Sequence, residues 1–216
     1  TSGSGSLLIT IGKSIAKYTK SKDDIMYYAQ ELKENTYNLT RMNLVMRGIK
    51  PDNIFTRCGD TLEQDWPMYD DVTQEYNPLY LDAVVSNPPY SQRWDPKHKD
   101  TDPRYRYGIA PKGKADYAFL LHDLYHLKPE GIMTIVLPHG ILFRGDALGG
   151  PDGQGEGEGK IRRNLIENNN IEAIIGLPAN IFFGTGIPTI IMALRQKREE
   201  SDVLFIDASK GFTKVG

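Results

Sequence analysis

The sequence has 216 residues, of which 39% are hydrophobic and 25% charged, and a formal net charge of −2. This length suffices for one domain with a sizeable core, and the composition is typical of a globular chain rather than a disordered one. A net charge near zero excludes a uniformly basic nucleic-acid coat but allows a local basic patch. The single cysteine, Cys58, excludes an internal disulfide framework. A single cysteine also fits a reducing compartment, so we expect a cytoplasmic protein. No apolar run approaches the roughly 20 residues of a membrane span, so we expect no membrane contact.

Helical and strand-like hydrophobic spacing alternates along the chain. Apolar residues at helical spacing predict helices at residues 7–20, in a segment that stops at Gly48, at 115–127 and at 160–167. Short β-prone runs predict strands at 25–29, 53–57, 81–85, 132–137, 171–177, 189–194 and 203–207. This alternation predicts an α/β fold with a mostly parallel sheet, and the short connections among the last three strands allow an antiparallel strand. Residues 91–114 are polar and irregular, and we expect the glycine-rich residues 149–159 to form a flexible loop.

The sequence SNPPY, residues 86–90, directly follows the strand predicted at 81–85. Two consecutive prolines fix the backbone and remove two N–H donors, so the segment presents carbonyl acceptors on a stiff support. Open α/β sheets bind ligands beyond the carboxyl ends of their strands, which is where this segment is predicted to lie. A turn that only caps the strand explains an isolated Asn-Pro pair equally well.

Asn87, Pro88, Pro89 and Tyr90 together resemble the Asp/Asn/Ser-Pro-Pro-aromatic signature of amino-group methyltransferases that use S-adenosylmethionine. The resemblance implies that these four residues are catalytic. The amine of a heteroaromatic base is a poor nucleophile because its lone pair is delocalised into the ring. The side-chain oxygen of Asn87 and the carbonyl of Pro88 would accept the two amine hydrogens, and Tyr90 would stack on a base flipped out of the duplex.

The first six residues, TSGSGS, admit two interpretations. Alternating Gly and Ser are typical of a flexible linker, but glycines before a helix also let a backbone pass close to a ligand. Beside the methyltransferase signature, the stretch resembles the cofactor loop of adenine methyltransferases, Asp-Pro-x-x-Gly-x-Gly, without its Asp-Pro. The resemblance implies that S-adenosylmethionine is bound by Thr1, Ser2, Gly3, Ser4 and Gly5.

Acidic residues follow the next two predicted strands. Glu31 comes after the strand at 25–29, where an acid is expected to accept hydrogen bonds from the cofactor ribose, although a solvated helix-cap glutamate is the alternative. In CGDTL, Asp60 resembles the residue that binds the adenine amino group of the cofactor, and a Gly-Asp turn explains it nearly as well. We therefore expect Glu31, Asp60, the adjacent Thr61 and Asn87 to complete the cofactor site.

Longer stretches resemble the modification subunit of type I restriction-modification systems over essentially the whole chain. They are NPPYSQRW, APKGKADYAFLLHDLYHL, VLPHGILFRG, KIRRNLIENNNIEAIIGLP and IFFGTGIPTIIMAL. The resemblance implies a single Rossmann-like methyltransferase core over residues 1–216. It also implies methylation of adenine N6 in double-stranded DNA, together with a specificity subunit and a restriction subunit. That family has a helical domain before the cofactor loop and helices after the last strand, so we expect a fragment truncated at both ends.

Residues 91–114 carry seven Lys or Arg against three Asp, with aromatic residues among them. Cations and aromatic rings beside a base-binding site suit contact with phosphates and bases, while a solvated polar loop is the alternative. The candidate DNA contacts in this segment are Trp94, Arg104, Arg106, Lys112 and Lys114. Phe183 is a candidate for a clamp on the target base, although an aromatic pair after a strand more commonly packs in the core.

Other chemistries receive less support from the sequence. His122 and His126 are spaced four apart on a predicted helix, but no third ligand is evident, so no metal site is predicted. No Pro-Cys dipeptide supports the covalent mechanism of cytosine-C5 methylation. A cytosine-N4, protein-glutamine or ribosomal RNA methyltransferase would fit the same tetrapeptide, and a catalytically silent DNA-binding module could keep the same fold. The basic, aromatic segment favours nucleic acid over a peptide.

Overall fold

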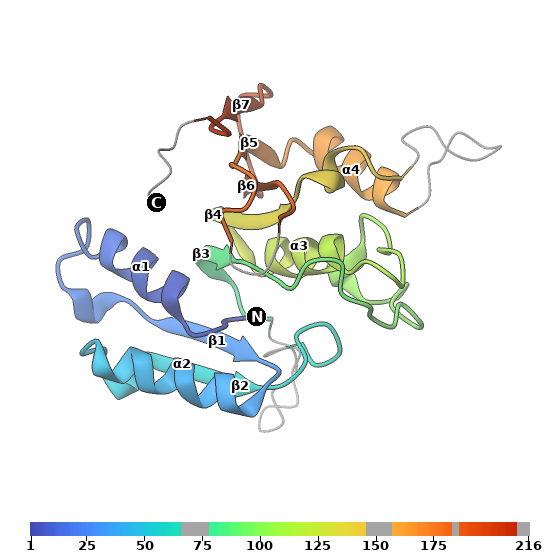
Figure 1. Ribbon diagram of the computed structural model, residues 1–216. Coiled ribbons are helices and arrows are strands. Elements are labelled where there is room, and N and C mark those ends of the chain that lie inside the picture. Colours follow the sequence, from blue (N-terminus) through green and yellow to red (C-terminus); the bar gives the residue numbers. More distant parts are fainter. Residues whose placement is uncertain (66–77, 146–156, 183–185, 211–216) are drawn as a thin grey trace. The chain divides into compact units, whose positions relative to one another are not determined.

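Figure 1 shows the computed structural model of the chain, which describes residues 1–65, 78–145, 157–182 and 186–210. The chain divides into two compact units. Unit 1 comprises Thr1–Leu79 and Val85–Asn87, and unit 2 comprises Tyr80–Val84 and Pro88–Gly216. Among the described residues, no helix is both long and apolar enough to cross a membrane.

Unit 1 is built on two parallel strands. Its elements are α1 (Ser6–Ile15), the 3₁₀ turn η1 (Lys22–Asp24), β1 (Tyr27–Glu31), α2 (Glu34–Met46), the 3₁₀ turn η2 (Pro51–Asn53) and β2 (Ile54–Cys58). The register of β1 and β2 runs from Tyr27 opposite Ile54 to Glu31 opposite Cys58. Because the carboxyl ends of parallel strands meet at one edge of the sheet, Glu31 and Cys58 are neighbours at that edge.

One face of β1 packs against α1. Tyr27 and Ala29 alternate along the strand and are both buried. A Cβ on Gly12 of α1 would lie 2.3 Å from the Tyr27 hydroxyl oxygen, so only glycine lets the helix approach the strand this closely. Burial also raises the pKa of Tyr27. This close packing fixes the direction in which α1 leaves the glycine-rich loop that precedes it.

Unit 2 contains most of a five-stranded sheet and two longer helices. Its elements are β3 (Leu81–Ser86, whose last two residues belong to unit 1), η3 (Pro103–Tyr105), α3 (Asp116–Tyr125), β4 (Leu127–Pro138), η4 (His139–Leu142), α4 (Glu158–Glu167), β5 (Ile171–Gly176), β6 (Thr189–Arg195) and β7 (Leu204–Asp207). The strand order is β3-β4-β6-β5-β7. β6 runs antiparallel to β4 and β5, while β5 and β7 are parallel. The antiparallel strand expected near the end of the chain is therefore β6.

The core of unit 2 lies between the central strands and the helices. Inward-facing residues alternate along β4 and β6, as the two-residue period of a strand requires. The fully or almost fully buried side chains are Met133, Ile135, Leu137, Ile190, Met192, Leu194, Tyr117, Leu120, Ile161 and Leu165. The hydroxyl of Tyr117 donates to the Ile141 carbonyl at 2.9 Å, and burial raises the pKa of this phenol to about 12. α3 is thus anchored rigidly in the core.

The predicted helices and strands are all present, and several differ at their ends; β1, for example, covers Tyr27–Glu31 rather than residues 25–29. α1 stops at Ile15 rather than residue 20. The nitrogens of Lys17 and Tyr18 donate to carbonyls three residues earlier, those of Ser14 and Ile15, which is the 3₁₀ pattern that commonly ends an α-helix. β4 begins at Leu127 and includes a Lys-Pro-Glu-Gly stretch that has the composition of a turn. α4 begins at Glu158, so residues 158–159 of the predicted flexible loop are helical, and 149–156 lie outside the described residues. The single catalytic core over 1–216 stays a prediction.

Candidate active site

The glycine-rich loop at the start of unit 1 has a left-handed backbone at both glycines. The φ angles of Gly3 and Gly5 are +55° and +79°. A Cβ on Gly5 would lie 3.2 Å from Thr40 Cγ2, whereas a Cβ on Gly3 would meet no atom within 4 Å. The Gly5 nitrogen donates to the Ser2 carbonyl at 2.9 Å, which closes the turn into α1. Glycine is required at these positions for conformation, and the space beside Gly3 is open to a ligand.

Two side chains of α2 hold this loop. Thr40 Oγ1 donates to the Gly3 carbonyl at 2.6 Å and also lies 3.3 Å from Ser2 Oγ. Asn43 Nδ2 donates to the Ser4 carbonyl at 2.9 Å. The two residues are three positions apart and therefore share one face of the helix. Sequence reasoning missed both, although a buried threonine and a polar neighbour on the inner face of a helix were a usable signal.

Glu31 lies at the glycine-rich loop, and its predicted role in ribose binding stays a prediction. Its Oε2 accepts from the Gly3 nitrogen at 3.0 Å, and its Oε1 accepts from the Leu32 nitrogen at 3.1 Å. The Ser2 nitrogen donates to the Gln30 carbonyl at 3.0 Å, so the loop follows the end of β1. The Lys33 nitrogen also donates to Oε1, at 3.4 Å, so the second lone pair of Oε2 is the one that allows Glu31 to accept from a ligand hydroxyl.

Asp60 and Thr61 lie in the turn after β2, within the same unit. Asp60 Oδ1 accepts from the Leu62 nitrogen at 2.9 Å, which makes an Asx turn. The Gly59 nitrogen donates to the Glu31 carbonyl at 3.0 Å, and the Thr1 nitrogen lies 3.4 Å from Thr61 Oγ1. The turn after β2 is thereby brought beside both the end of β1 and the glycine-rich loop. The turn accounts for one Asp60 oxygen, and the adenine-binding role stays a prediction.

The proline-rich segment after β3 divides at the boundary of the units. Asn87 is exposed and belongs to unit 1, whereas Pro88 is buried, Tyr90 is partly buried and both belong to unit 2. Burial, with a smaller effect of the Asp116 carboxylate, raises the pKa of Tyr90 to about 12. Tyr90 is therefore a neutral phenol at physiological pH, and its ring can stack on an uncharged planar group.

The segment that follows Tyr90 is tied to residues 111–116. The Ser91 nitrogen donates to Asp116 Oδ1 at 2.7 Å, and the Ala115 nitrogen donates to the Gln92 carbonyl at 2.9 Å. Trp94 donates twice, from its backbone nitrogen to the Lys112 carbonyl and from Nε1 to the Pro111 carbonyl, both at 3.1 Å. Trp94 is only 7% exposed. It packs inside unit 2 rather than presenting its ring for the predicted DNA contact.

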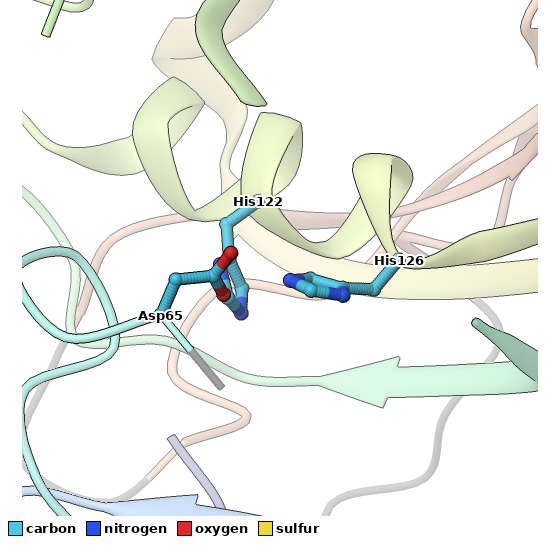
Figure 2. A group of neighbouring side chains, drawn as sticks. All are labelled: Asp65, His122 and His126. Atoms are coloured by element: carbon cyan, nitrogen blue, oxygen red, sulfur yellow. The ribbon is translucent and has the colours of Figure 1, made fainter. Parts of the chain in front are cut away.

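Arg104 is also an interior residue. Its guanidinium forms bidentate hydrogen bonds with Asp102, including one of 2.7 Å from NH2 to Oδ2, and NH1 lies 3.0 Å from His122 Nδ1. Its side chain is 2% exposed, which leaves no surface for the predicted DNA contact. Burial, the neighbouring His126 and Arg104 lower the pKa of His122 well below its usual range. The ring centroids of His122, on α3, and His126, the residue that follows the helix, are 4.7 Å apart, and the two side chains lie next to each other in Figure 2.

The remaining predicted DNA contacts differ in their surroundings. Arg106 and Lys112 are exposed and Lys114 is partly exposed. The Arg106 guanidinium lies 5.0 Å from the centroid of the Tyr107 ring, a cation–π distance that limits its freedom. These three cations carry the DNA-contact hypothesis for unit 2. Phe183 lies outside the described residues.

Comparison with known proteins identifies the family of this chain. All of residues 1–216 match the family described as N-6 DNA methylase. The chain belongs to the N-6 DNA methylase family. The Rossmann-like fold predicted from the sequence is confirmed by a solved type I restriction-modification methyltransferase subunit from Streptococcus thermophilus. This subunit is 45% identical, with a TM-score of 0.85 over 100% of the present chain and 42% of its own.

Two curated relatives of the chain are methylase subunits of type I restriction enzymes. The MpnII subunit of Mycoplasma pneumoniae is 38% identical over 98% of the present chain and 38% of its own length. The HindI subunit of Haemophilus influenzae is 31% identical over 98% of the chain and 44% of its own length. The chain therefore spans about two fifths of the length of these relatives.

Proposed function

We propose that this N-6 DNA methylase transfers a methyl group from S-adenosylmethionine to N6 of adenine in double-stranded DNA. The observation that carries the proposal is the family match, which covers the entire chain. Within the matched region, Asn87-Pro88-Pro89-Tyr90 directly follows β3. Fold alone would not assign this chemistry, because one fold hosts many activities. The residues around the glycine-rich loop and after β3 supply the two halves of the argument.

The glycine-rich loop fits the cofactor. S-adenosylmethionine, when bound, supplies a sulfonium methyl group that is open to nucleophilic attack. Gly3 leaves open space beside the backbone, and Glu31 places carboxylate oxygens at the end of β1, where ribose hydroxyls can donate to them. Thr1, Ser2, Ser4 and Gly5 would line the methionine moiety, and Asp60 with Thr61 would receive the adenine ring.

Asn87 and Pro88 would activate the target amine. The Asn87 side-chain oxygen and the Pro88 carbonyl are acceptors, so they would draw on the two N6 hydrogens and make the nitrogen lone pair available for in-line attack. The neutral ring of Tyr90 would replace the stacking that the flipped adenine loses. The product ammonium is acidic, and its proton can leave to water without a dedicated base.

DNA and partner subunits complete the proposal. Arg106, Lys112 and Lys114 would contact phosphates, which gives affinity without sequence specificity. The named relatives are methylase subunits of type I restriction enzymes. We therefore assign the protein to a cytoplasmic complex with a specificity subunit that selects the DNA site and a restriction subunit.

The test is transfer of a labelled methyl group to DNA by the intact protein, with its partner subunits supplied. The DNA is then digested to nucleosides and separated by mass. N6-methyladenine that disappears with Asn87→Ala would support the proposal. Label in N4-methylcytosine, in ribosomal RNA or in protein glutamine would support the corresponding alternative, and cofactor binding without any transfer would indicate a silent module.

A further inference from the structure

A buried charge network lies directly behind the proline-rich segment, entirely within unit 2. Its centre is Asp116, the first residue of α3, whose side chain is completely buried. Asp116 Oδ1 accepts from the Ser91 nitrogen at 2.7 Å, and Asp116 Oδ2 accepts from Arg144 NH2 at 2.5 Å. Arg144 also donates to both oxygens of Glu158 on α4, at 2.8 and 3.1 Å. A single guanidinium therefore joins two carboxylates from two helices.

Burying these two carboxylates costs hydration free energy, which the surrounding groups must compensate. A carboxylate that loses all contact with water is stable only when a cation and hydrogen-bond donors compensate for the lost hydration. Asp116 meets this condition with the Arg144 guanidinium and one backbone N–H. Glu158 is also buried, and it accepts from Nε and NH2 of Arg144. The carboxylate of Asp116 is thus held in one orientation, with one oxygen directed at the proline-rich segment.

The donor of the hydrogen bond to Asp116 Oδ1 has an unusual backbone. Ser91 has a φ of +52°, in the left-handed region that residues other than glycine rarely adopt. Such a conformation persists only when its surroundings fix it, and it ends the stiff Pro88-Pro89-Tyr90 stretch immediately before the chain turns away. The Ser91 nitrogen is held by its hydrogen bond to the Asp116 carboxylate. The start of α3, itself anchored in the core through Tyr117, thereby sets where the segment ends.

We propose that Asp116 is a positioning residue for methyl transfer, whose carboxylate, oriented by Arg144 and Glu158, fixes the backbone of Pro88–Ser91. This inference rests on the proposed function. The Pro88 carbonyl and the Tyr90 ring must keep one orientation toward the adenine, and displacements of about 1 Å lower catalytic rates by as much as a hundredfold. The influence of Asp116 on the pKa of Tyr90 agrees with this close arrangement. Asp116 itself does not touch the substrate.

The test compares Asp116→Ala and Asp116→Asn in the intact protein, with its partner subunits and DNA. Alanine removes the tether, and asparagine keeps one acceptor oxygen, for either Ser91 or Arg144 but not both. Glu172→Gln is the matched control, because it neutralises another carboxylate of unit 2 that pairs with an arginine, Arg195, outside this network. We expect kcat per bound cofactor to fall about 30-fold for Asp116→Ala, less for Asp116→Asn and not at all for Glu172→Gln.

Two further measurements separate positioning from folding. The dissociation constant of S-adenosylmethionine should stay within about twofold of the wild-type value, because the glycine-rich loop belongs to unit 1. Amide hydrogen exchange in a peptide covering residues 88–94 should accelerate in Asp116→Ala and not in Glu172→Gln.

The possible results lead to distinct conclusions. Unchanged exchange in residues 88–94 would overturn the tether, and faster exchange with an unchanged kcat per bound cofactor would overturn its role in the reaction. Faster exchange with a lower kcat and unchanged cofactor affinity would support the inference. A wild-type protein that forms no N6-methyladenine would refute the proposed function and the role with it, while the exchange data would still report the tether.

Discussion

The glycine-rich loop of unit 1 and the part of the proline-rich segment that belongs to unit 2, Pro88–Ser91, are held in their conformations by different interactions. The first takes its shape from left-handed glycines and from neutral side chains, Thr40 and Asn43, that donate to its carbonyls. The second takes its shape from two prolines and from a buried carboxylate that is balanced by a guanidinium. Neutral hydrogen bonds contribute about 1 kcal/mol each, whereas a disrupted buried ion pair costs several. Substitutions in the two regions should therefore differ in size.

The largest effect is expected for Arg144→Met. The variant keeps an apolar side chain of about the length of the aliphatic part of arginine but leaves Asp116 and Glu158 buried without a cation, so the free energy of unfolding should fall by about 3–5 kcal/mol. Arg195→Met is the control, since Arg195 and Glu172 are each about one third exposed, and it should cost about 1 kcal/mol or less. Urea denaturation measures both. Equal losses would mean that burial does not set the strength of these pairs.

A smaller effect is expected for Gly5→Ala in unit 1. Alanine is strained at a φ of +79°, and its Cβ would lie 3.2 Å from Thr40 Cγ2, so the free energy of unfolding should fall by about 1–2 kcal/mol. Binding of S-adenosylmethionine, followed by calorimetry, should weaken in parallel. Gly113→Ala meets no atom within 4 Å and should change neither quantity. A fully stable Gly5→Ala protein would show that the loop adapts rather than holding one conformation.

Thr40→Val should have a still smaller effect. Valine has nearly the shape of threonine but cannot donate to the Gly3 carbonyl, so cofactor affinity should fall about fivefold, the equivalent of one neutral hydrogen bond. Thr10→Val, which removes an exposed hydroxyl that donates within α1, should leave the affinity unchanged. The dissociation constants of both variants give the answer. If the two variants bind equally well, α2 does not organise the loop.

The smallest effect concerns pH and unit 2. The pKa of His122 in the folded protein lies well below its usual value of 6.5, so the unfolded chain binds a proton that the folded protein does not as pH falls through that value. Stability should therefore decline from pH 7.5 to pH 5.5. The decline in Tm should be smaller for His122→Gln than for wild type or for His98→Gln, which replaces an exposed histidine. Identical pH profiles for all three would exclude His122 as the titrating group.

The sequence was sufficient to predict those candidate site residues that directly follow a strand along the chain. Residues at the ends of β1 and β3 could be assigned because a strand pattern stops there and a motif begins, and Glu31 indeed lies at the glycine-rich loop. Asp116 was not recognised, because an acidic residue at the start of a helix has an ordinary explanation in the helix dipole. Only the fold reveals that Ser91 and Arg144 meet at its carboxylate.

The polar segment 91–114 was harder to interpret for the same reason. Its composition is typical of a protein surface, and nothing in the sequence distinguishes the Lys and Arg residues that become buried from those that stay exposed. In the structure Arg104 is buried and forms an ion pair with Asp102, two residues earlier, whereas Arg106 is exposed and lies over the Tyr107 ring. The spacing of apolar residues distinguishes buried from exposed positions only in helices and strands. The sole regular element that the structure describes in this segment is the 3₁₀ turn η3. Burial in an irregular segment is decided by individual partners, which composition does not encode.

The register of β1 and β2 has a practical consequence for experiment. Cys58 is exposed, stands opposite Glu31 at the edge that faces the glycine-rich loop, and is the only cysteine of the chain. A thiol-reactive fluorophore can therefore be attached at one defined point without any engineering. Because Gly59, the next residue, donates to the Glu31 carbonyl, a label on Cys58 would lie within a few bonds of the carboxylate proposed to bind the ribose. Its fluorescence should therefore change when cofactor binds, if the proposed role of Glu31 is right.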